Sequence, residues 1–397
     1  MKELLLLYSG GLDTSVMIKW MNENLGYDVS TLTLDIGNND LKSIREKAEA
    51  IGAVETFVED VKQEFSYEYI SKSILANGSY EGYPLSTALA RPLMAKKAVE
   101  LAEKHGFEAI AHGSTGRGND QVRFELGIKA LNPSLEMLAP VRDWNMLRSE
   151  EIEYAKKNNI IVPSDGKYSV DENLWGRSIE GSEIENMSLP VPEDAYEWLV
   201  PPWEAGPGEV IKLEFSNGLP VAINDSDFEL QNLIANLNII GGRNSIGLID
   251  HVEDRITGIK SREVYECPAA EIITYAHGYL ESLILNKHEI SIKSFLDSKF
   301  SQFVYNGLWY DPAMKPLIAG EEILNSEING SISLKLYKGK IYFNGSKGAN
   351  FSYNSNVANY STYEFDQKSS KGFIDIFKND TVYSILARQK AKEEALS

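Results

Sequence analysis

The spacing of apolar residues in the first part of the chain predicts alternating strands and helices. Residues 2–9 form a continuous apolar run typical of a buried strand, and residues 13–26 have the amphipathic pattern of a helix that ends at Gly26. The same reasoning predicts further strands at 27–37, 55–61 and 107–114, and further helices at 41–52 and 90–106. Strands that alternate with helices indicate an α/β fold in which an N-terminal parallel sheet has helices on both faces.

A different pattern follows a boundary that we expect near residues 165–185. The stretch at 187–209 is rich in Pro and Gly, as a crossing segment would be. Beyond it, residues 210–224 and 332–343 alternate apolar and polar residues around short turns, which predicts two β-hairpins. Helical patterns lie between the hairpins, at 225–241 and 269–285. The second domain is therefore expected to be α+β.

The end of the chain carries a separate helical pattern. From about Asn379, residues Val382, Ile385 and Leu386 recur at helical spacing with charged residues around them. A helix with one apolar stripe packs either on its own chain or on a partner subunit, and the stripe alone does not distinguish the two. We therefore predict three parts, at residues 1–167, 168–375 and 376–397.

The charge of the chain argues against nucleic acid as a partner. A formal net charge of −19 and a sequence pI near 4.8 repel a phosphate backbone, and the sequence has no Lys- or Arg-rich stripe. A small anion can still bind where local donors outweigh this field, so the arginines that matter are expected to be Arg91, Arg117 and Arg123.

Other features bear on compartment and metal. The apolar run at Leu4–Leu7 is too short for a signal peptide or a membrane span, so we expect a soluble protein with no membrane partner. Cys267 is the only cysteine, which excludes an intramolecular disulfide and a Cys-based zinc site and favours a cytoplasmic location. We expect no metal ligands among the histidines, because they lack metal-ligand spacing: His105, His112, His251, His277 and His288.

The strongest chemical signal is the sequence Ser-Gly-Gly-Leu-Asp-Thr-Ser at residues 9–15, between a predicted strand and a predicted helix. Two glycines let the backbone approach a phosphate without a Cβ in the way, and the helix N-terminus supplies N–H donors and a positive dipole. The alternative is an ordinary turn capped by Asp13 or Thr14, which a Ser-Gly-Gly triplet alone would favour. The chain contains no Walker loop of the form G-x-x-x-x-G-K-[ST].

A second polar segment, at residues 111–124, follows another predicted buried strand. It holds glycines, hydroxyls, an amide, a carboxylate and two arginines, so it can contact several charged groups of an amino-acid substrate. The alternative is a flexible surface turn. Ligands of open α/β sheets bind at the carboxyl ends of the strands, so the two segments together favour a binding site.

These segments resemble a known family. Residues 9–15 resemble the PP-loop of ATP pyrophosphatases, which implies adenylation and a fold like that of the adenine nucleotide alpha hydrolases. The chain as a whole is similar to argininosuccinate synthase, through segments that occur in the expected order: SGGLDTS, YPLSTALARP, AHGSTGRGNDQVRFE, YSVDENLWGRS, IGLIDHVEDR and KSREVYE. The resemblance implies a PP-loop nucleotide-binding domain at 1–167, an α+β synthetase domain at 168–375 and a C-terminal oligomerisation helix at 376–397.

The resemblance also implies which residues bind each ligand. ATP would contact Leu7, Tyr8, Ser9, Gly10, Gly11, Leu12, Asp13, Thr14, Ser15, Leu34 and Gly113. Citrulline would contact Tyr83, Thr87, Asn119, Arg123, Ser169, Ser178, Glu253 and Tyr265. Aspartate would contact Thr115, Asn119 and Asp120. The candidate catalytic residues are Asp13, Asp120 and Arg123. The chemistry is suitable, because a guanidinium pairs with a carboxylate and a carboxylate accepts from an ammonium group.

The implied reaction has two steps and belongs to arginine biosynthesis. The ureido oxygen of citrulline attacks the α-phosphate of ATP, which releases pyrophosphate and leaves citrullyl-AMP; the aspartate amine then expels AMP to give argininosuccinate. Mg²⁺ is expected as a partner of the phosphates, with Asp13 and Asp120 as candidate supports. The family also implies a homotetramer. The alternatives are another PP-loop adenylating ligase, a non-catalytic nucleotide-binding protein and a scaffold protein of the same fold.

Three positions depart from the family pattern. Arg117 stands where Lys is usual, Ala88 where some relatives have a hydroxyl, and Leu248 where Arg is common. None of these removes an expected ligand, but Ala88 and Leu248 leave the positioning of citrulline and local ion pairing open.

Overall fold

The fold is described by a computed structural model, which covers residues 2–37, 41–144, 146–161, 167–361 and 364–396. Contacts within the chain divide it into two units, Met1–Asn350 and Phe351–Ser397. The first unit contains three β-sheets and the second contains helices alone among its described residues. The expected division at residue 167 falls inside the first unit and stays a prediction; the neighbouring residues 162–166 lie outside the described part of the chain.

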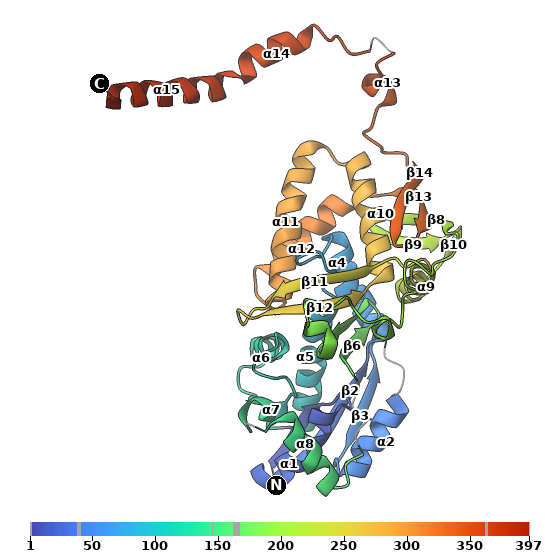
Figure 1. Ribbon diagram of the computed structural model, residues 1–397, viewed down its shortest axis with the longest axis vertical. Helices are drawn as coiled ribbons and strands as arrows, with labels where there is room; N and C mark the ends of the chain where they lie inside the picture. Colours follow the sequence, from blue (N-terminus) through green and yellow to red (C-terminus); the bar gives the residue numbers. More distant parts are fainter. Residues whose placement is uncertain (1, 38–40, 145, 162–166, 362–363, 397) are drawn as a thin grey trace. The chain divides into compact units, whose positions relative to one another are not determined.

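The N-terminal sheet is parallel, as predicted. It consists of β1 (Lys2–Leu7), β2 (Tyr27–Asp35), β3 (Thr56–Asp60), β4 (Ala109–Ala111) and β5 (Glu136–Leu138). The strands lie in the order β3-β2-β1-β4-β5, and every neighbouring pair is parallel (Figure 1). The strands predicted from the apolar runs are confirmed as β1 to β4, whereas no prediction covered β5.

Helices cover both faces of this sheet. The main ones are α1 (Leu12–Leu25), α2 (Leu41–Ile51), α5 (Ser86–His105), α6 (Asp120–Leu131), α7 (Pro140–Asp143) and α8 (Arg148–Lys157). The chain moves from β1 to β2 to β3 in one direction across the sheet, and right-handed crossovers place the intervening helices α1 and α2 on one face. It then moves from β3 to β4 to β5 in the other direction, which places α5 and α6 on the other face. On the first face, Leu4 and Leu6 of β1 belong to one buried cluster with Met17 and Met21 of α1.

A strained segment leads from β3 to α5. The chain first forms a continuous helical stretch of α3 (Lys62–Glu64), a π-helical turn (Phe65–Ile70) and α4 (Ser71–Leu75). It then enters residues 77–85, which we call the strap, where Asn77, Glu81 and Leu85 have positive φ angles of 43°, 49° and 59°. A left-handed backbone costs about 1–2 kcal/mol for a residue with a side chain, so surrounding contacts must hold it.

Two antiparallel sheets follow. The first consists of β6 (Ser169–Asn173), β7 (Gly176–Glu180), β11 (Leu248–Asp254) and β12 (Lys260–Glu266), in the order β11-β12-β7-β6. The second consists of β8 (Glu209–Ser216), β9 (Leu219–Ile223), β10 (Ser226–Asp227), β13 (Gly330–Tyr337) and β14 (Lys340–Lys347), in the order β10-β9-β8-β13-β14. Both predicted hairpins are confirmed in the second sheet, as β8–β9 and β13–β14, whereas no prediction covered the first sheet.

Four helices complete the first unit: α9 (Leu230–Arg243), α10 (Pro268–Ile284), α11 (Lys287–Tyr305) and α12 (Met314–Asn325). The predicted helices at 225–241 and 269–285 are confirmed as α9 and α10. A buried lysine, Lys293 of α11, joins three of these helices through ion pairs with Glu281, Asp297 and Glu321. Because a buried charge is stable only when it is paired, this cluster fixes how α10, α11 and α12 pack.

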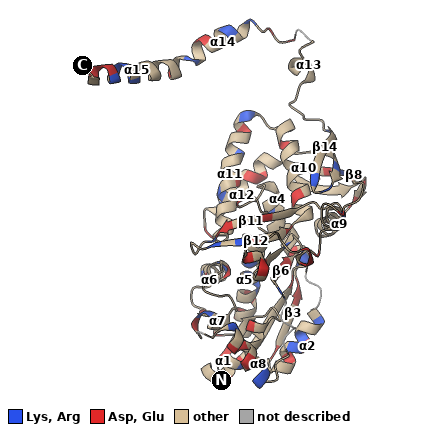
Figure 2. Ribbon diagram, in the orientation of Figure 1, with Lys and Arg blue, Asp and Glu red and all other residues tan. Residues whose placement is uncertain are grey.

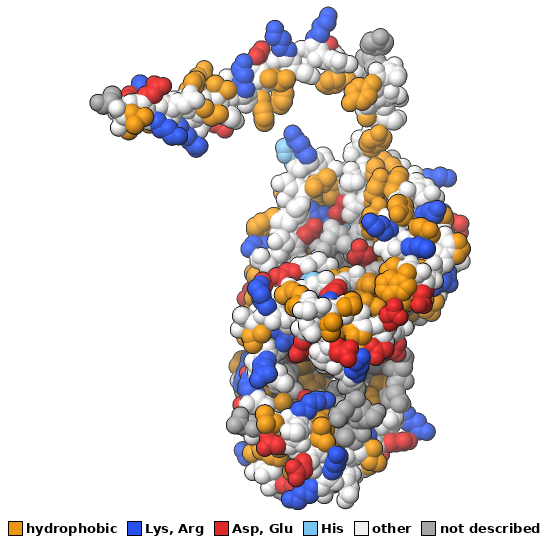
Figure 3. Space-filling view, in the orientation of Figure 1, with side chains coloured by type: hydrophobic (Ala, Val, Ile, Leu, Met, Phe, Trp, Pro, Cys, Tyr) orange, Lys and Arg blue, Asp and Glu red, His pale blue; other side chains and the backbone are white. Residues whose placement is uncertain are grey.

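The second unit contains α13 (Ser355–Ala358), α14 (Ser369–Phe377) and α15 (Asn379–Leu396), of which α15 is the predicted C-terminal helix. Neither α14 nor α15 has a buried residue. Figure 3 shows hydrophobic side chains exposed along this unit. An apolar surface of this kind is typical of a region that packs against something else.

Two further features of the described residues are the length of the apolar helices and the distribution of charged residues. None of the helices in the described ranges is long and apolar enough to cross a membrane. Figure 2 shows Lys and Arg positions scattered among Asp and Glu over many elements.

Candidate active site

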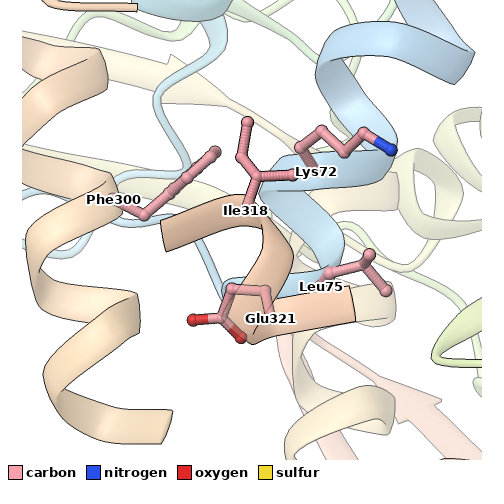
Figure 4. A pocket seen from close by; sticks show the side chains of 5 residues that line it. All are labelled: Lys72, Leu75, Phe300, Ile318 and Glu321. Carbon is pink, nitrogen blue, oxygen red and sulfur yellow. The ribbon is translucent and has the colours of Figure 1, made fainter. Parts of the chain in front are cut away.

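Two pockets in the described part of the chain are candidates for a site. The first lies between α4, α11 and α12, where Leu75, Phe300 and Ile318 approach one another (Figure 4). The space inside it that a water molecule could occupy is about 0 Å³. The second, which we call the polar pocket, has a volume of about 160 Å³ and lies among polar side chains. Of these two pockets, the polar pocket is the one with room for a ligand.

The polar pocket lies between the α5 and α6 side of the first sheet and the β11-β12-β7-β6 sheet. Its lining contains five carboxylates and three guanidiniums, so an amino-acid ligand could find partners for both of its charged ends. The lining residues are Tyr83, Thr87, Arg91, Gly118, Asn119, Asp120, Arg123, Ser169, Asp171, Ser178, Glu180, Glu253, Arg255, Glu263 and Tyr265.

The two loops singled out from the sequence lie side by side at the carboxyl edge of the parallel sheet. Neighbouring strands β1 and β4 pair with Leu6 opposite Ala111, so the loops that follow them begin next to each other. A Cβ atom added at Gly113 would come within 2.7 Å of Thr14 Cγ2. The loop at 112–119 therefore touches the loop at 8–15, in the position where open α/β sheets bind ligands.

The loop at 8–15 has the geometry of an anion site. Gly10 has a φ of 77°, which a residue with a side chain rarely adopts. The Ser9 and Thr14 hydroxyl oxygens are 3.2 Å apart, and Lys47 Nζ donates to the Gly10 carbonyl oxygen at 2.5 Å. Because α1 begins at Leu12, the N–H groups of its first turn face outward as donors, and a cation lies beside them.

A pair of carboxyl groups lies beside this loop. Burial raises the pKa of Glu151 to about 8, and its hydrogen bond and charge interaction with Asp13 act in the same direction. Arg148 Nη1 lies 3.7 Å from Asp13 Oδ1 and offsets part of this effect. The pair therefore keeps one proton near neutral pH, which reduces the negative charge next to a phosphate-binding loop.

One wall of the polar pocket is a buried ion-pair chain. Arg91 Nη2 of α5 donates to Asp120 Oδ2 at 2.8 Å and also to Asp171 Oδ2 of β6. Burial alone would raise the pKa of Asp120, but the charges of Arg91 and Arg123 outweigh it and bring the pKa to about 2. Asp120 is therefore ionised throughout the physiological range. Arg91 Nε is buried without a hydrogen-bond partner among the described residues.

Arg123 of α6 carries an unused donor. Its Nη1 donates to Asp120 Oδ1 at 3.2 Å, and its Nε donates to the Tyr305 carbonyl oxygen at 3.0 Å. The side chain is only 3% exposed, and Nη2 has no hydrogen-bond partner of good geometry in the described ranges. A buried donor without a partner costs about 1–3 kcal/mol, so Arg123 Nη2 is prepared for an acceptor on a ligand.

The opposite wall holds two carboxylates around one hydroxyl. The Tyr265 hydroxyl lies 2.8 Å from Glu253 Oε2 and 2.5 Å from Glu263 Oε2. A hydroxyl has one hydrogen, so it cannot donate to both carboxylates at once. Burial, and next the charge of Glu263, raise the pKa of Glu253 above its usual value. A positively charged group would neutralise this wall, which makes it a site for an ammonium group.

A third acidic group lines the pocket beside an arginine. Burial and the charge of Glu263 raise the pKa of Glu180 to about 7, although its ion pair with Arg255 acts against them. Arg255 Nη2 also donates to Glu263 Oε1 at 2.9 Å. The protonation of this part of the pocket therefore changes near neutral pH.

The structure brings most of the sequence-predicted ligand residues together. All eight residues assigned to citrulline line the polar pocket, together with Asp120 from the aspartate set. Thr115 is exposed on the loop at 112–119 and does not belong to the lining, and Arg117 is also exposed. Leu34 lies near the carboxyl end of β2, beside the strand that leads into the loop at 8–15. These positions agree with the predicted grouping, while the ligand each residue binds stays a prediction.

The structure also adds residues that sequence reasoning missed. Arg91 was expected to matter without an assigned role, and four further lining residues carried no expectation: Asp171, Glu180, Arg255 and Glu263. Each of these four lies two positions from a predicted residue on or next to a strand, in the pairs Ser169/Asp171, Ser178/Glu180, Glu253/Arg255 and Glu263/Tyr265. Because alternate residues of a strand share a face, the period of two was the signal that could have found them.

Comparisons with known proteins agree with this geometry. Two family models match, the one described as Arginosuccinate synthase N-terminal HUP domain over residues 3–161 and the one described as Arginosuccinate synthase C-terminal domain over residues 168–382. Argininosuccinate synthase of Thermoplasma acidophilum is 57% identical over 97% of this chain and 96% of its own length. The enzymes of Picrophilus torridus, 57% identical over 97% of both chains, and Pyrococcus furiosus, 50% identical over 96% of this chain and 93% of its own, are also similar.

Proposed function

This chain belongs to the argininosuccinate synthase family, and from that premise we propose how its residues share the reaction. The enzyme ligates citrulline and aspartate at the expense of ATP, through citrullyl-AMP, and forms argininosuccinate, AMP and pyrophosphate. It is therefore an ATP-dependent C–N ligase of arginine biosynthesis. The assignments that follow concern which side chains hold each substrate.

The loop at 8–15 is proposed to hold the phosphates of ATP. Its N–H groups lie at the start of α1, and the hydroxyls of Ser9 and Thr14 point to each other across the loop. Lys47, which donates to the Gly10 carbonyl oxygen, supplies a cation beside it. Leu34 and Gly113 would lie near the adenosine, because Leu34 is near the end of β2 and Gly113 follows β4, the two strands that flank β1.

Citrulline is proposed to bind in the polar pocket through its α-carboxylate and α-ammonium groups, which share one carbon and would lie between Arg123 and Glu253. The single observation that carries this assignment is the buried, unpartnered Nη2 of Arg123, which a carboxylate would satisfy. The ammonium group would then lie by Glu253 and Tyr265, where two carboxylates share one hydroxyl. This arrangement leaves the ureido group of citrulline directed away from the charged walls.

Aspartate is proposed to bind at the junction of the two sites, on Thr115, Asn119 and Asp120. These residues lie on the loop at 112–119 or at the start of α6, between the loop that holds ATP and the polar pocket. The ionised carboxylate of Asp120 can accept a hydrogen bond from the aspartate ammonium group. The amine would thus be held close to the carbon that adenylation activates.

Catalysis in this scheme depends on position and charge instead of a covalent enzyme intermediate. Arg123 and Asp120 orient the amino-acid substrates, and Asp13 lies at the start of α1 beside the phosphates. Holding three substrates in register removes much of the entropy cost of bringing them together, which in favourable cases lowers a barrier by about 7–11 kcal/mol. Donors fixed around the loop at 8–15 would stabilise charge on the phosphates.

We further propose that Mg²⁺ enters with ATP. The described residues contain no group of three or more His, Cys, Asp or Glu side chains placed to hold a metal ion. Mg²⁺ commonly binds through substrate phosphates, waters and one or two carboxylates, which needs no such group. Asp13 is the better-placed support, because Asp120 is already bound by Arg91 and Arg123.

The same proposal covers location and assembly. We expect the enzyme to work in the cytoplasm as a homotetramer, with its C-terminal helices packed on other copies of the chain. The apolar side chains of α14 and α15 are exposed, which supports an intermolecular contact.

The decisive experiment measures pyrophosphate release from the purified full-length chain with ATP, Mg²⁺ and citrulline, with and without aspartate. Release should require citrulline, and AMP and argininosuccinate should appear in equal amounts when aspartate is added. The variant Arg123→Met, which removes every donor of the guanidinium, should need far more citrulline while it still binds ATP.

Other outcomes would point to the alternatives. Release of pyrophosphate with a different nucleophile would indicate another PP-loop adenylating ligase. ATP binding without pyrophosphate release under any condition would indicate a non-catalytic nucleotide-binding protein. Either result would contradict the substrate assignments above.

A further inference from the structure

Tyr305 lies behind the polar pocket and was absent from the predicted site. It is the last residue of α11 and only 1% exposed. It does not belong to the pocket lining, yet its atoms contact three lining residues, Asn119, Arg123 and Glu253. These contacts use the hydroxyl, the carbonyl oxygen and the ring, each in a different way.

The hydroxyl joins two walls of the pocket. It accepts from Asn119 Nδ2 at 3.0 Å, and its single hydrogen faces Glu253 Oε1 at 2.6 Å and the Asp254 carbonyl oxygen at 3.0 Å, of which the nearer carboxylate is the stronger acceptor. Asn119 Nδ2 also donates to the same Glu253 oxygen at 3.0 Å, so the three groups form a closed triangle. The Asn119 side-chain oxygen in turn accepts from the Ile256 N–H at 2.8 Å. The amide orientation of Asn119 is thereby determined, because its oxygen and its nitrogen each have a specific partner.

The rest of Tyr305 holds Arg123. The Tyr305 carbonyl oxygen accepts from Arg123 Nε at 3.0 Å, and the guanidinium carbon lies 5.0 Å from the centre of the Tyr305 ring. With Nε bound to Tyr305 and Nη1 bound to Asp120, Nη2 is the nitrogen left for a ligand. Tyr305 therefore helps to select which donor of Arg123 is directed at the substrate.

The ring of Tyr305 also holds the strap. The rings of Tyr305 and Tyr80 stack with their centres 3.5 Å apart at an angle of 11°. Tyr80 lies between Asn77 and Glu81, two residues with positive φ, and the strap continues to Tyr83, which lines the pocket. Since left-handed backbone persists only where contacts hold it, the stack on Tyr305 helps to keep Tyr83 in place.

We propose that Tyr305 is a positioning residue for citrulline. Tyr305 holds Asn119, Arg123, Glu253 and the strap in an arrangement that fits both the α-carboxylate and the α-ammonium group of this substrate. The inference rests on the proposed assignment of the polar pocket to citrulline. It predicts that the Tyr305 hydroxyl affects the use of citrulline and leaves the use of ATP unchanged.

The test is the variant Tyr305→Phe, which keeps the ring, its stack and the backbone carbonyl but removes the hydroxyl. Because that hydroxyl bonds a carboxylate, the kcat/KM for citrulline should fall by about tenfold to a hundredfold. The KM for ATP should stay at its wild-type value. The matched control is Tyr69→Phe, since Tyr69 is also a buried tyrosine with a partnered hydroxyl, at 3.3 Å from the Tyr310 hydroxyl, and lies outside the pocket lining.

A pH profile separates positioning from a general loss of stability. The hydroxyl of Tyr305 lowers the pKa of Glu253, against burial and the charge of Glu263, which raise it. Without the hydroxyl, the acidic limb of the profile of kcat/KM for citrulline should move to higher pH. The other groups that face Glu253 are unchanged in the variant: Arg123, Arg255, His251, Glu263, Tyr265, Tyr80 and Tyr83.

The outcomes are distinct. A Tyr305→Phe enzyme with wild-type citrulline kinetics and an unshifted acidic limb would overturn the inference. So would an equal loss of kcat/KM for citrulline and ATP, since that indicates general damage. If Tyr305→Phe does not fold, Tyr80→Leu removes the stack instead and should raise the KM for citrulline by about twofold to tenfold. A wild-type enzyme that shows no dependence on citrulline would contradict the proposed function itself.

Discussion

At the scale of single residues, Arg123 shows how a side chain becomes a binding group. The sequence identifies an arginine within a polar segment, but three arginines in or near that segment fit this description: Arg91, Arg117 and Arg123. In the structure Arg117 is exposed, and both Arg91 and Arg123 keep one buried nitrogen without a partner among the described residues: Nε in Arg91, whose Nη2 binds two aspartates, and the terminal Nη2 in Arg123. The difference lies in partners from distant parts of the chain.

The substitution Arg123→Lys tests that nitrogen. Lysine keeps the charge but cannot bond Asp120, Tyr305 and a ligand in the fixed directions of a guanidinium. Loss of one hydrogen bond between charged groups, about 1.5–3 kcal/mol, should lower kcat/KM for citrulline by about tenfold to a hundredfold, as measured by pyrophosphate release. The control is Arg262→Lys, a paired arginine whose bonds to Asp250 lie outside the pocket. Equal effects of the two substitutions would contradict the role of Arg123.

Glu151 supports a prediction about stability and pH. Its pKa is about 8 in the folded chain because of burial and the neighbouring Asp13, against 4.5 for an ordinary glutamate. Between about pH 4.5 and 8 the folded state therefore binds more protons than the unfolded state, so this group makes the protein less stable as pH rises. The contribution is fully present below pH 4.5 and is lost as pH passes through 8.

The substitution Glu151→Gln should remove this dependence. From pH 5 to 8, the free energy of unfolding in urea should fall less steeply in the variant than in the wild type. The difference in slope is limited to about 1.4 kcal/mol per pH unit for one proton. The exposed neighbour Glu153→Gln serves as the control. Parallel curves for wild type and Glu151→Gln would show that Glu151 does not titrate in this range.

At the scale of elements, the important event is the contact between two loops. The pairing of β1 with β4 brings the loop at 8–15 and the loop at 112–119 to one edge of the sheet, although about a hundred residues separate them along the chain. At Gly113 the contact leaves no room for a side chain larger than hydrogen, since a Cβ there would meet Thr14 Cγ2 at 2.7 Å. Thr14 is β-branched and therefore has few rotamers in which to move away.

The substitution Gly113→Ala should for this reason disturb the loop that we assign to ATP. We expect the KM for ATP to rise by about fivefold to 150-fold, which corresponds to about 1–3 kcal/mol for an overpacked contact, while the KM for citrulline changes less. Gly116→Ala in the same loop is the control, because its added Cβ would lie 3.5 Å from Arg142 Cγ, an ordinary contact. A normal KM for ATP in Gly113→Ala would argue against an ATP site here.

Elements also explain which strands the sequence revealed. The strands β1, β2 and β4 of the parallel sheet are mostly buried and read as apolar runs, whereas the edge strand β5 is partly exposed and was missed. The strands β8 and β13 of the two hairpins alternate clearly. The sheet β11-β12-β7-β6 was missed because one of its faces supports the polar pocket. Charged residues such as Asp171, Glu253 and Glu263 occupy positions where a packed sheet would have apolar ones.

At the scale of the whole molecule, the described residues of the second unit form no buried core. The side chains of Phe373 and Phe377 stack with their ring centres 5.0 Å apart and are 63% and 72% exposed. The stripe predicted from the sequence, Val382, Ile385 and Leu386, is also exposed on α15. Since an isolated helix gains little stability from its own hydrogen bonds, these helices are expected to depend on contact with another copy of the chain.

The double substitution Phe373→Ser and Phe377→Ser should break this contact. Sedimentation velocity should show the wild type at about four times the 44.3 kDa of one chain, and the variant at a lower mass that falls further on dilution. The control replaces two lysines with serine: Lys371 of the same helix and Lys368, which directly precedes it. An unchanged mass in the phenylalanine variant, or a monomeric wild type, would contradict the tetramer.

The sequence by itself determined the parallel sheet, the two hairpins, the terminal helix and the loop at 8–15, because these follow from the order of residues over short distances. Through its resemblance it also indicated the family and nine of the fifteen residues that line the polar pocket. Only the tertiary structure decided which donors are unpaired and which residues hold them. Asn119 and Glu253 are 134 positions apart, and Arg123 and Tyr305 are 182 apart. Contacts at such distances depend on how the sheets and helices pack, and no local pattern of residues records them.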